Sequence, residues 1–226
     1  MHKKIVVAIS FLLAGNAHAA SVVLDSFDAN LGSWIANTTQ TNVSHQVAGG
    51  NPGGFLQTDN TGNNTFFYAV GAVNTSANYS GVFAPGLWNI AVDLNFMQGN
   101  FGDALLRFRF HDSSANGWHT SLTNAFTNTW NTRSVIFDTT WSDADAISNG
   151  WVKESDGILA TPSFAGLWGD VYTSEVRLLG TTSSTNLVAG IDNYSAMVVP
   201  IPAAIWLLGS GLVGLIAVTR RGKARC

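Results

Sequence analysis

The sequence predicts an all-β domain, an antiparallel β-sandwich or jelly roll, between two apolar ends. Short apolar runs alternate with turns rich in Asn, Gly and Thr from residue 20 to residue 199, as is typical of short strands joined by turns. Two of the runs also show the period of two that places alternate side chains on opposite faces of a strand. About eight such runs fit into these 180 residues, which is the size and strand number of one sandwich domain.

The period of two is clearest over residues 88–96 and 104–110. One face of the first stretch is formed by Trp88, Ile90, Val92, Leu94 and Phe96. One face of the second is formed by Ala104, Leu106, Phe108 and Phe110, and the other by Leu105, Arg107, Arg109 and His111. The segment between them, residues 98–103, is short and contains glycine. We therefore expect the two strands to pair as an antiparallel hairpin.

The remaining elements follow from the same apolar runs and their flanking turn residues. Further strands are expected at residues 43–47, 55–59, 66–73, 130–138, 174–179 and 187–198. Short helical turns are expected at residues 143–149 and 163–171.

The N-terminal end has the composition of a secretory signal peptide. Lys3 and Lys4 precede an apolar run over residues 5–14, and Ala17-His18-Ala19 fits the small-x-small rule of signal peptidase. The run is too short to span a bilayer. We therefore expect residues 1–19 to be a signal helix that is cleaved after Ala19, and the chain to be exported.

The C-terminal end combines an uncharged apolar segment with a basic cluster. Residues 201–218 would form about 27 Å of helix, close to the ~30 Å of a bilayer's hydrocarbon core. Four basic residues follow within residues 220–225, and such residues stay cytoplasmic. We therefore expect a transmembrane helix over residues 201–219, with the domain of residues 20–198 outside and the C-terminus inside.

The charges are distributed unevenly along the chain. Six of the 11 Lys and Arg lie in the two ends, whereas all 14 Asp and Glu lie within residues 20–199. That segment thus holds 5 basic against 14 acidic residues, a net charge of −9, although the whole chain has −3. Nucleic acid is excluded as a partner because it requires a basic surface. Neutral polymers, cations or a solvated surface suit such a domain.

The tail has a specific order of parts. The motif Val199-Pro200-Ile201-Pro202-Ala203-Ala204 leads into Trp206-Leu207, Gly209-Ser210-Gly211-Leu212 and Arg220-Arg221. This order resembles the PEP-CTERM sorting signal of Gram-negative bacteria, with Ile201 where the motif has Glu. The resemblance implies a sorting tail over residues 199–226 that an exosortase, a membrane-embedded cysteine protease, processes. It also implies a periplasmic domain held transiently at the inner membrane, then placed at the cell surface or released, often in species that make extracellular polysaccharide.

A second set of short blocks is spread over the domain. It comprises Ser26-Phe27-Asp28, Gly32-Ser33-Trp34, the GGNPGGFL stretch of residues 49–56, Asp59, Trp130, Trp141, residues 164–167 and 176–178, and the closing Ala189-Gly190-Ile191-Asp192-Asn193-Tyr194. The layout resembles laminin IV-type and related sugar-binding jelly rolls. The resemblance implies the fold and not an activity, because this architecture hosts many functions.

The glycine-rich loop over residues 49–54 is a candidate calcium site. Calcium prefers several oxygens from carboxylates and backbone carbonyls in a flexible cage. In the jelly rolls that the sequence resembles, one structural calcium often lies between the first strand, an early loop and the last strand. Those places offer Asp25 or Asp28, the backbone of residues 50–53, and Asp192. The alternative is that the glycines only permit positive φ in a tight turn.

Two tryptophans are candidates for stacking on sugar rings. Trp118 and Trp151 follow glycines in polar stretches, and an exposed indole offers a flat apolar face to a sugar. For any single Trp, burial in the core is the alternative, and it is the one we favour. Trp34 and Trp88 are instead expected in the core.

The basic row of the second periodic strand has two interpretations. Arg107, Arg109 and His111 lie on one side of that strand, so they are candidates for a polar ligand surface. The interpretation that we favour is a solvated outer face, paired to acids such as Asp93.

An enzymatic activity is not expected. Glycosidases need two carboxylates at a set separation, and no acid cluster surrounds Glu154 or Glu175, the only two Glu. The one Gly-Ser-Gly sequence lies in the apolar tail, so it is no nucleophile elbow. We expect a non-catalytic envelope or extracellular-matrix protein that binds or accompanies extracellular polysaccharide. A structural or adhesion protein without a sugar site and a glycan-active hydrolase are the alternatives.

Overall fold

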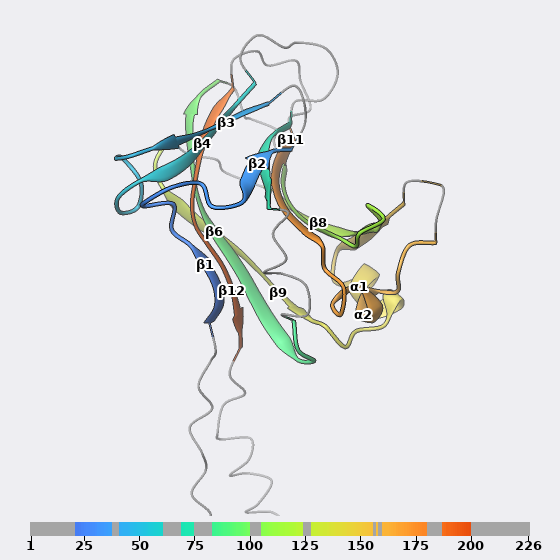
Figure 1. Cartoon of the computed structure of the whole chain (residues 1–226). Helices are drawn as coiled ribbons and strands as arrows, with labels where there is room; N and C mark the ends of the chain where they lie inside the picture. The colour runs from blue at the N-terminus through green and yellow to red at the C-terminus, as the bar shows by residue number, and fades with distance from the viewer. Residues whose placement is uncertain are drawn as a thin grey trace, which may run out of the picture. The chain divides into compact units, whose positions relative to one another are not determined.

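The computed structural model describes residues 21–37, 41–60, 69–74, 83–99, 105–123, 128–155, 157, 160–179 and 187–199. These residues form twelve strands and two short helices (Figure 1). The strands make two six-stranded sheets in which every pair is antiparallel. The predicted all-β antiparallel sandwich is therefore confirmed.

The first sheet is built around the last strand of the domain. Its order is β3 (Asn42–Gln46), β4 (Phe55–Asp59), β12 (Val188–Val198), β6 (Leu87–Gln98) and β9 (Asn131–Asp138), with β1 (Ser21–Asp25) also on β12. β4 pairs with residues 188–191 of β12, and β1 pairs with residues 194–197. Between the two, the register of β12 against β6 shifts and Asn193 has a φ of 48°. A bulge thus lies where the neighbour of β12 changes.

The second sheet carries the basic row. Its order is β10 (Trp151–Glu154), β8 (Gly117–Thr123), β7 (Leu105–His111), β11 (Thr173–Leu179), β5 (Ala69–Asn74) and β2 (Trp34–Ala36). Burial alternates strictly along β7. Leu106, Phe108 and Phe110 are fully buried, whereas Arg107 and the other residues of the basic row lie on the opposite, outward face. The period of two predicted both faces of this strand.

The predicted hairpin is wrong, because β6 and β7 belong to different sheets. β6 pairs with β12 and β9, whereas β7 pairs with β8 and β11. Trp88 of β6 and Phe108 of β7 are both buried, and they enter one core from opposite layers. In a hairpin these apolar faces would lie side by side on one sheet, whereas a sandwich places them against each other. Sequence alternation gives each strand an apolar face but does not distinguish these two arrangements.

All eight predicted strands are present close to their predicted bounds, and four further strands form. β2 and β10 have only three and four residues, and β1 is also short. β8 buries four consecutive residues, from Gly117 to Thr120, so it shows no period of two. These four strands depend on their neighbours in the sheets rather than on a local pattern.

The two predicted helical turns form α1 (Asp143–Ser148) and α2 (Phe164–Leu167). Ser142 and Asp145 make a capping box at the start of α1, which satisfies backbone N–H groups that have no partner within the helix. α1 contacts β10 and α2 contacts β8, so both lie at one end of the second sheet (Figure 1).

Aromatic rings fill the core beside these helices. The rings of Phe137 and Trp168 stack with centroids 4.4 Å apart, and Trp151 and Phe164 pack with centroids 5.1 Å apart. Trp34 and Trp88 are also buried. The expectation that Trp34 and Trp88 lie in the core is confirmed.

The predicted signal helix of residues 1–19, the transmembrane helix of residues 201–219 and the motif residues Pro200, Ile201, Pro202, Arg220 and Arg221 lie outside the described residues. Val199, the first residue of the motif, follows β12 and is half-buried. In the part of the chain that the structure describes, no helix is long and apolar enough to cross a membrane. Export and sorting stay predictions.

Candidate ligand-binding face

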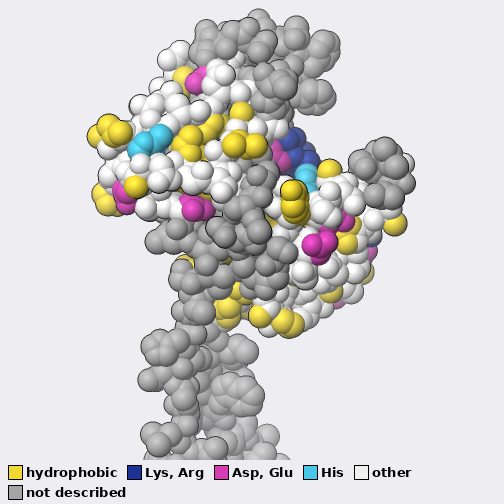
Figure 2. Space-filling model, in the orientation of Figure 1, with side chains coloured by type: hydrophobic (Ala, Val, Ile, Leu, Met, Phe, Trp, Pro, Cys, Tyr) yellow, Lys and Arg dark blue, Asp and Glu magenta, His cyan; other side chains and the backbone are white. Residues whose placement is uncertain are grey.

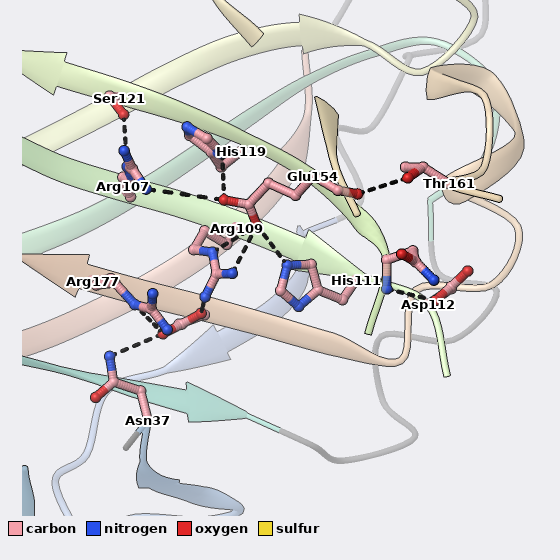
Figure 3. Close-up of polar contacts among 12 residues, drawn as sticks. Asn37, Arg107, Arg109, His111, Asp112, His119, Ser121, Glu154, Thr161 and Arg177 are labelled. Atoms are coloured by element: carbon pink, nitrogen blue, oxygen red, sulfur yellow. Dashed lines mark hydrogen bonds and ion pairs between the residues drawn. The ribbon is translucent and has the colours of Figure 1, made fainter. Parts of the chain in front are cut away.

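The outward side of the second sheet gathers charged side chains from four strands. The register of β7 places Arg109 opposite Glu175 of β11 and opposite His119 of β8. Residues opposite one another in antiparallel strands share a face of the sheet. These side chains and their neighbours form a charged face, which comprises Asn37, Arg107, Arg109, His111, His119, Ser121, Glu154, Glu175 and Arg177 (Figure 3).

Arg109 lies at the centre of the charged face. Its Nε and Nη2 donate to Glu154 Oε2 at 3.0 and 2.7 Å, and its Nη1 donates to Glu175 Oε2. The three side chains are only 14%, 19% and 5% exposed. Burial alone would lower the pKa of Arg109, but the two carboxylates raise it above its ordinary value. One guanidinium thus links acids from β10 and β11 in a largely buried network.

Glu175 is held by further donors from two directions. Its Oε1 accepts from Arg177 Nε at 2.7 Å and from Asn37 Nδ2 at 2.9 Å. Thr41 Oγ1 donates to the amide oxygen of Asn37 at 2.9 Å, which fixes the orientation of that amide. The carboxylate therefore has little freedom to move.

Glu154 is surrounded by cationic and imidazole nitrogens. His111 Nε2 lies 2.9 Å from Oε2 and His119 Nδ1 lies 2.6 Å from Oε1. Burial alone would raise the pKa of the Glu154 carboxyl. The contacts with His111, His119 and Arg109 outweigh this effect and hold its pKa well below the ordinary value. Glu154 is therefore an ionised acceptor near neutral pH.

Gly117 makes room for this arrangement on the strand between His111 and Glu154. Both residues lie opposite Gly117 in the register, one on β7 and one on β10. A Cβ at Gly117 would lie 1.9 Å from the carbonyl oxygen of Phe110 and 2.7 Å from His111 Cδ2. The missing side chain allows the imidazole to reach the carboxylate.

Arg107 and Arg109 thus lie on the outward face predicted for them. That face is not the solvated one expected, because the two side chains are only 27% and 14% exposed, and their partners also differ from those expected. Asp93 lies in the first sheet, where it accepts from Thr132 Oγ1 at 2.5 Å and from Asn193 Nδ2 at 2.8 Å. The expected pairing with Asp93 is therefore wrong, because Asp93 of β6 and the arginines of β7 lie in different sheets.

Trp118 and Trp151 do not lie on this face, which corrects their assignment as stacking residues. Trp118 is 0% exposed and Trp151 is 1% exposed. The indole of Trp118 donates to the carbonyl of Pro162 at 3.1 Å and meets the ring of Phe164 edge-on. Both tryptophans follow a glycine in a polar stretch, which suggested exposure. They are buried because helices α1 and α2 cover this end of the sheet.

Glu154, Glu175 and Arg177 were missed as members of a site. They lie far from Arg109 in the sequence, and only strand order brings them together. One signal was present: Glu175-Val176-Arg177 repeats the charged–buried–charged pattern of Arg107-Phe108-Arg109. Three of the five basic residues within residues 20–199 lie in these two short stretches.

The glycine-rich loop does approach the last strand. Asn51 N donates to Asp192 Oδ2 at 2.6 Å, and Gly54 N donates to Asp28 Oδ1 at 3.3 Å. Asp25 accepts from the indole of Trp34 at 2.9 Å. The pKa of Asp192 is raised, first by burial and then by neighbouring carboxylates that include Asp28.

The loop also fits the alternative interpretation, in which the glycines permit positive φ in a tight turn, because Gly49 and Gly53 have φ of 94° and 88°. Within the described ranges, no three His, Cys, Asp or Glu side chains are placed to hold a metal ion. Calcium at Asp25, Asp28 and Asp192 stays a prediction.

No protein-family model and no curated protein matches the sequence. Solved structures do match. The CBM22-1 xylan-binding domain of Paenibacillus barcinonensis Xyn10C has a TM-score of 0.50 at 14% identity, over 81% of this chain and 97% of that one. A family 11 carbohydrate-binding module from Clostridium thermocellum, in complex with a β-1,3-1,4-mixed-linked tetrasaccharide, has a TM-score of 0.50 at 14% identity, over 77% and 94%. An arabinose-bound α-L-arabinofuranosidase has a TM-score of 0.51 at 10% identity, over 80% of this chain but 27% of that one. At these identities the likeness is one of fold.

Proposed function

We propose that this protein is a non-catalytic binding protein that recognises extracellular polysaccharide through the charged face. The observation that carries the proposal is the hydrogen-bonded set of Arg, His, Glu and Asn side chains on one side of the second sheet. Figure 2 shows basic side chains beside acidic and His side chains in a hollow of the surface. Sugar hydroxyls both donate and accept hydrogen bonds, so they suit a surface that presents both kinds of group in fixed positions.

The extent of the face supports a polymeric ligand. Its side chains come from β10, β8, β7 and β11, which are consecutive in the sheet, and Asn37 extends it beside β2. A surface that crosses several strands fits successive units of a chain molecule. Two solved structures of this fold are described as a xylan-binding domain and as a carbohydrate-binding module with a bound tetrasaccharide, which supports the same ligand class.

The state of the two glutamates supports binding rather than hydrolysis. A glycosidase needs one carboxylic acid with a raised pKa that protonates the leaving group. The pKa of Glu154 is instead lowered by its contacts with His111, His119 and Arg109. Glu175 accepts from Arg109, Arg177 and Asn37. Neither side chain is arranged as a proton donor to a sugar.

The two ends of the sequence support a location outside the cytoplasm. The signal-like residues 1–19 and the PEP-CTERM-like tail of residues 199–226 favour export, transient attachment at the inner membrane and processing by an exosortase. Intact-mass analysis of the protein from culture medium tests this part. A C-terminus near Pro200 is expected, and full-length protein found only in membranes would contradict processing.

Affinity electrophoresis of the full chain in mild detergent tests binding. The protein should be retarded in gels that contain a soluble polysaccharide. Ser121→Trp places a bulky ring on the charged face and should abolish retardation. Ser134→Trp places the same ring on the exposed side of β9, in the other sheet, and should leave it unchanged. If neutral and acidic polysaccharides all fail to retard the wild type, the proposed function is wrong.

A further inference from the structure

Two arginines of the charged face lie directly opposite one another. The register between β7 and β11 pairs Arg107 with Arg177. Like charges at directly opposite positions destabilise a pair of strands. The side chains are only 27% and 21% exposed, so water screens their repulsion incompletely. The pKa of Arg107 is lowered, mainly by burial, and Arg177 is among the cations that contribute to this.

The carboxylates of the face do not fully compensate this pair. Glu175 contacts Arg177 through Nε alone. Arg107 Nη1 lies 3.9 Å from Glu154 Oε1, and Arg107 Nε donates to Ser121 Oγ at 3.2 Å. Among the described residues, the terminal nitrogens of both arginines form no hydrogen bond. Two partly exposed guanidinium groups thus retain donors on the outward face (Figure 3).

The charge count points to an anion as their partner. The charged face holds three arginines and two glutamates, an excess of one positive charge before either imidazole is protonated. The rest of residues 20–199 holds 12 acidic and two basic residues. Basic residues therefore concentrate at one place on an otherwise acidic segment.

We propose that Arg107 and Arg177 bind a carboxylate or sulfate group of the ligand, which makes the ligand an acidic polysaccharide. This inference rests on the proposed function and specifies its ligand class. The planar fork of a guanidinium matches the oxygens of a carboxylate or sulfate. An anion between the two arginines also removes the repulsion that their register imposes. Because the surrounding segment is acidic, binding of a polyanion requires this local site rather than bulk attraction.

Matched polymers test the inference with the full chain in affinity electrophoresis. Polygalacturonate is compared with its methyl ester for the carboxylate, and dextran sulfate is compared with dextran for the sulfate. We expect at least one charged polymer to bind more tightly than its neutral counterpart, with affinity that falls as salt is raised. Arg107→Gln and Arg177→Gln should each weaken that binding about tenfold or more, the effect of losing one charge-assisted contact.

The control is Arg133→Gln, which removes a cation from β9 of the other sheet and should leave binding unchanged. Arg107→Lys keeps the charge but loses the fork, so it should bind with intermediate affinity. Melting curves identify any variant that fails to fold; Arg107→Gln should melt no lower than wild type, because it removes a like-charged neighbour. Preference for either charged polymer supports the site and names the anion.

The inference of an acidic ligand is overturned if charged and neutral polymers bind equally and if neither Arg107→Gln nor Arg177→Gln changes that binding. The proposed function would still stand in that case. Failure to bind any polysaccharide overturns both.

Discussion

Replacing Glu175 by Gln tests whether the charged face is a buried network or a set of loose surface pairs. The Glu175 side chain is 5% exposed, and its partners Arg109 and Arg177 are 14% and 21% exposed. The substitution preserves the shape of the side chain but removes the carboxylate partner of Arg177 and one of the two carboxylates that contact Arg109. Breaking a buried ion pair in this way costs about 3–5 kcal/mol. For a domain of this size the melting temperature should fall by roughly 6–20 °C.

A matched control comes from an exposed pair. Asp143 and Lys153 are joined at 2.8 Å, but both side chains are 38% exposed. Asp143→Asn is the same change from acid to amide, and its oxygen still accepts from Phe164 N. Solvent screening limits such a pair to about 1 kcal/mol or less.

Urea unfolding followed by tryptophan fluorescence gives both free energies of unfolding. The double variant Glu175→Gln with Arg177→Gln should recover part of the loss, since one uncompensated cation is removed with the anion. If Glu175→Gln costs no more than Asp143→Asn, Glu175 does not hold the network together, and the description of the charged face as buried and preorganised is wrong.

Three further predictions concern neighbouring features. The pKa of Glu154 is held below its ordinary value of about 4.3, so its stabilisation is complete above that pH and is lost as the pH falls. The difference in unfolding free energy between wild type and Glu154→Gln should therefore shrink between about pH 5 and pH 3, as measured by urea titrations; a constant difference would contradict the lowered pKa. Gly117→Ala should cost about 1–3 kcal/mol or more, because its Cβ would lie 1.9 Å from a carbonyl oxygen; an unchanged urea midpoint would show that β8 shifts freely. If the glycine-rich loop and Asp192 bind calcium, the melting temperature of wild type should be higher in millimolar calcium than in EDTA, whereas that of Asp192→Asn should not change. If wild type melts at the same temperature in both solutions, the loop is not a calcium site.

Sequence alone predicted the faces of individual strands with fair accuracy. Alternation is a local property of an extended chain, because successive side chains point to opposite sides whichever strand lies next to it. Hence the apolar face of β6, the buried residues of β7 and the outward direction of Arg107 and Arg109 followed from the sequence, whereas the burial of Ala91 and Asp93 on the other face of β6 did not. Strands without alternation, such as β8, could not be found in this way.

The identity of neighbouring strands was not predictable from alternation. Which strands pair depends on the free energy of the whole sandwich, in which every apolar face must meet another. The incorrect hairpin followed from this limit, as did the incorrect pairing of the arginines with Asp93. The incorrect assignment of Trp118 and Trp151 as exposed has the same cause, because a glycine beside a tryptophan does not indicate whether a helix covers that tryptophan.

The sequence by itself determined the class of the fold, the acidic character of the segment between the ends and the row of basic side chains on one strand. Composition and the period of side chains are sufficient for these three features, because none of them depends on which other segment of the chain lies next to it. Only the tertiary structure decided that Arg109 joins Glu154 to Glu175 and that Arg107 faces Arg177. These contacts connect residues far apart in the chain, and the order of β10, β8, β7 and β11 in one sheet brings them together. The charged face is thus a property of strand order, for which no short stretch of sequence carries a signature.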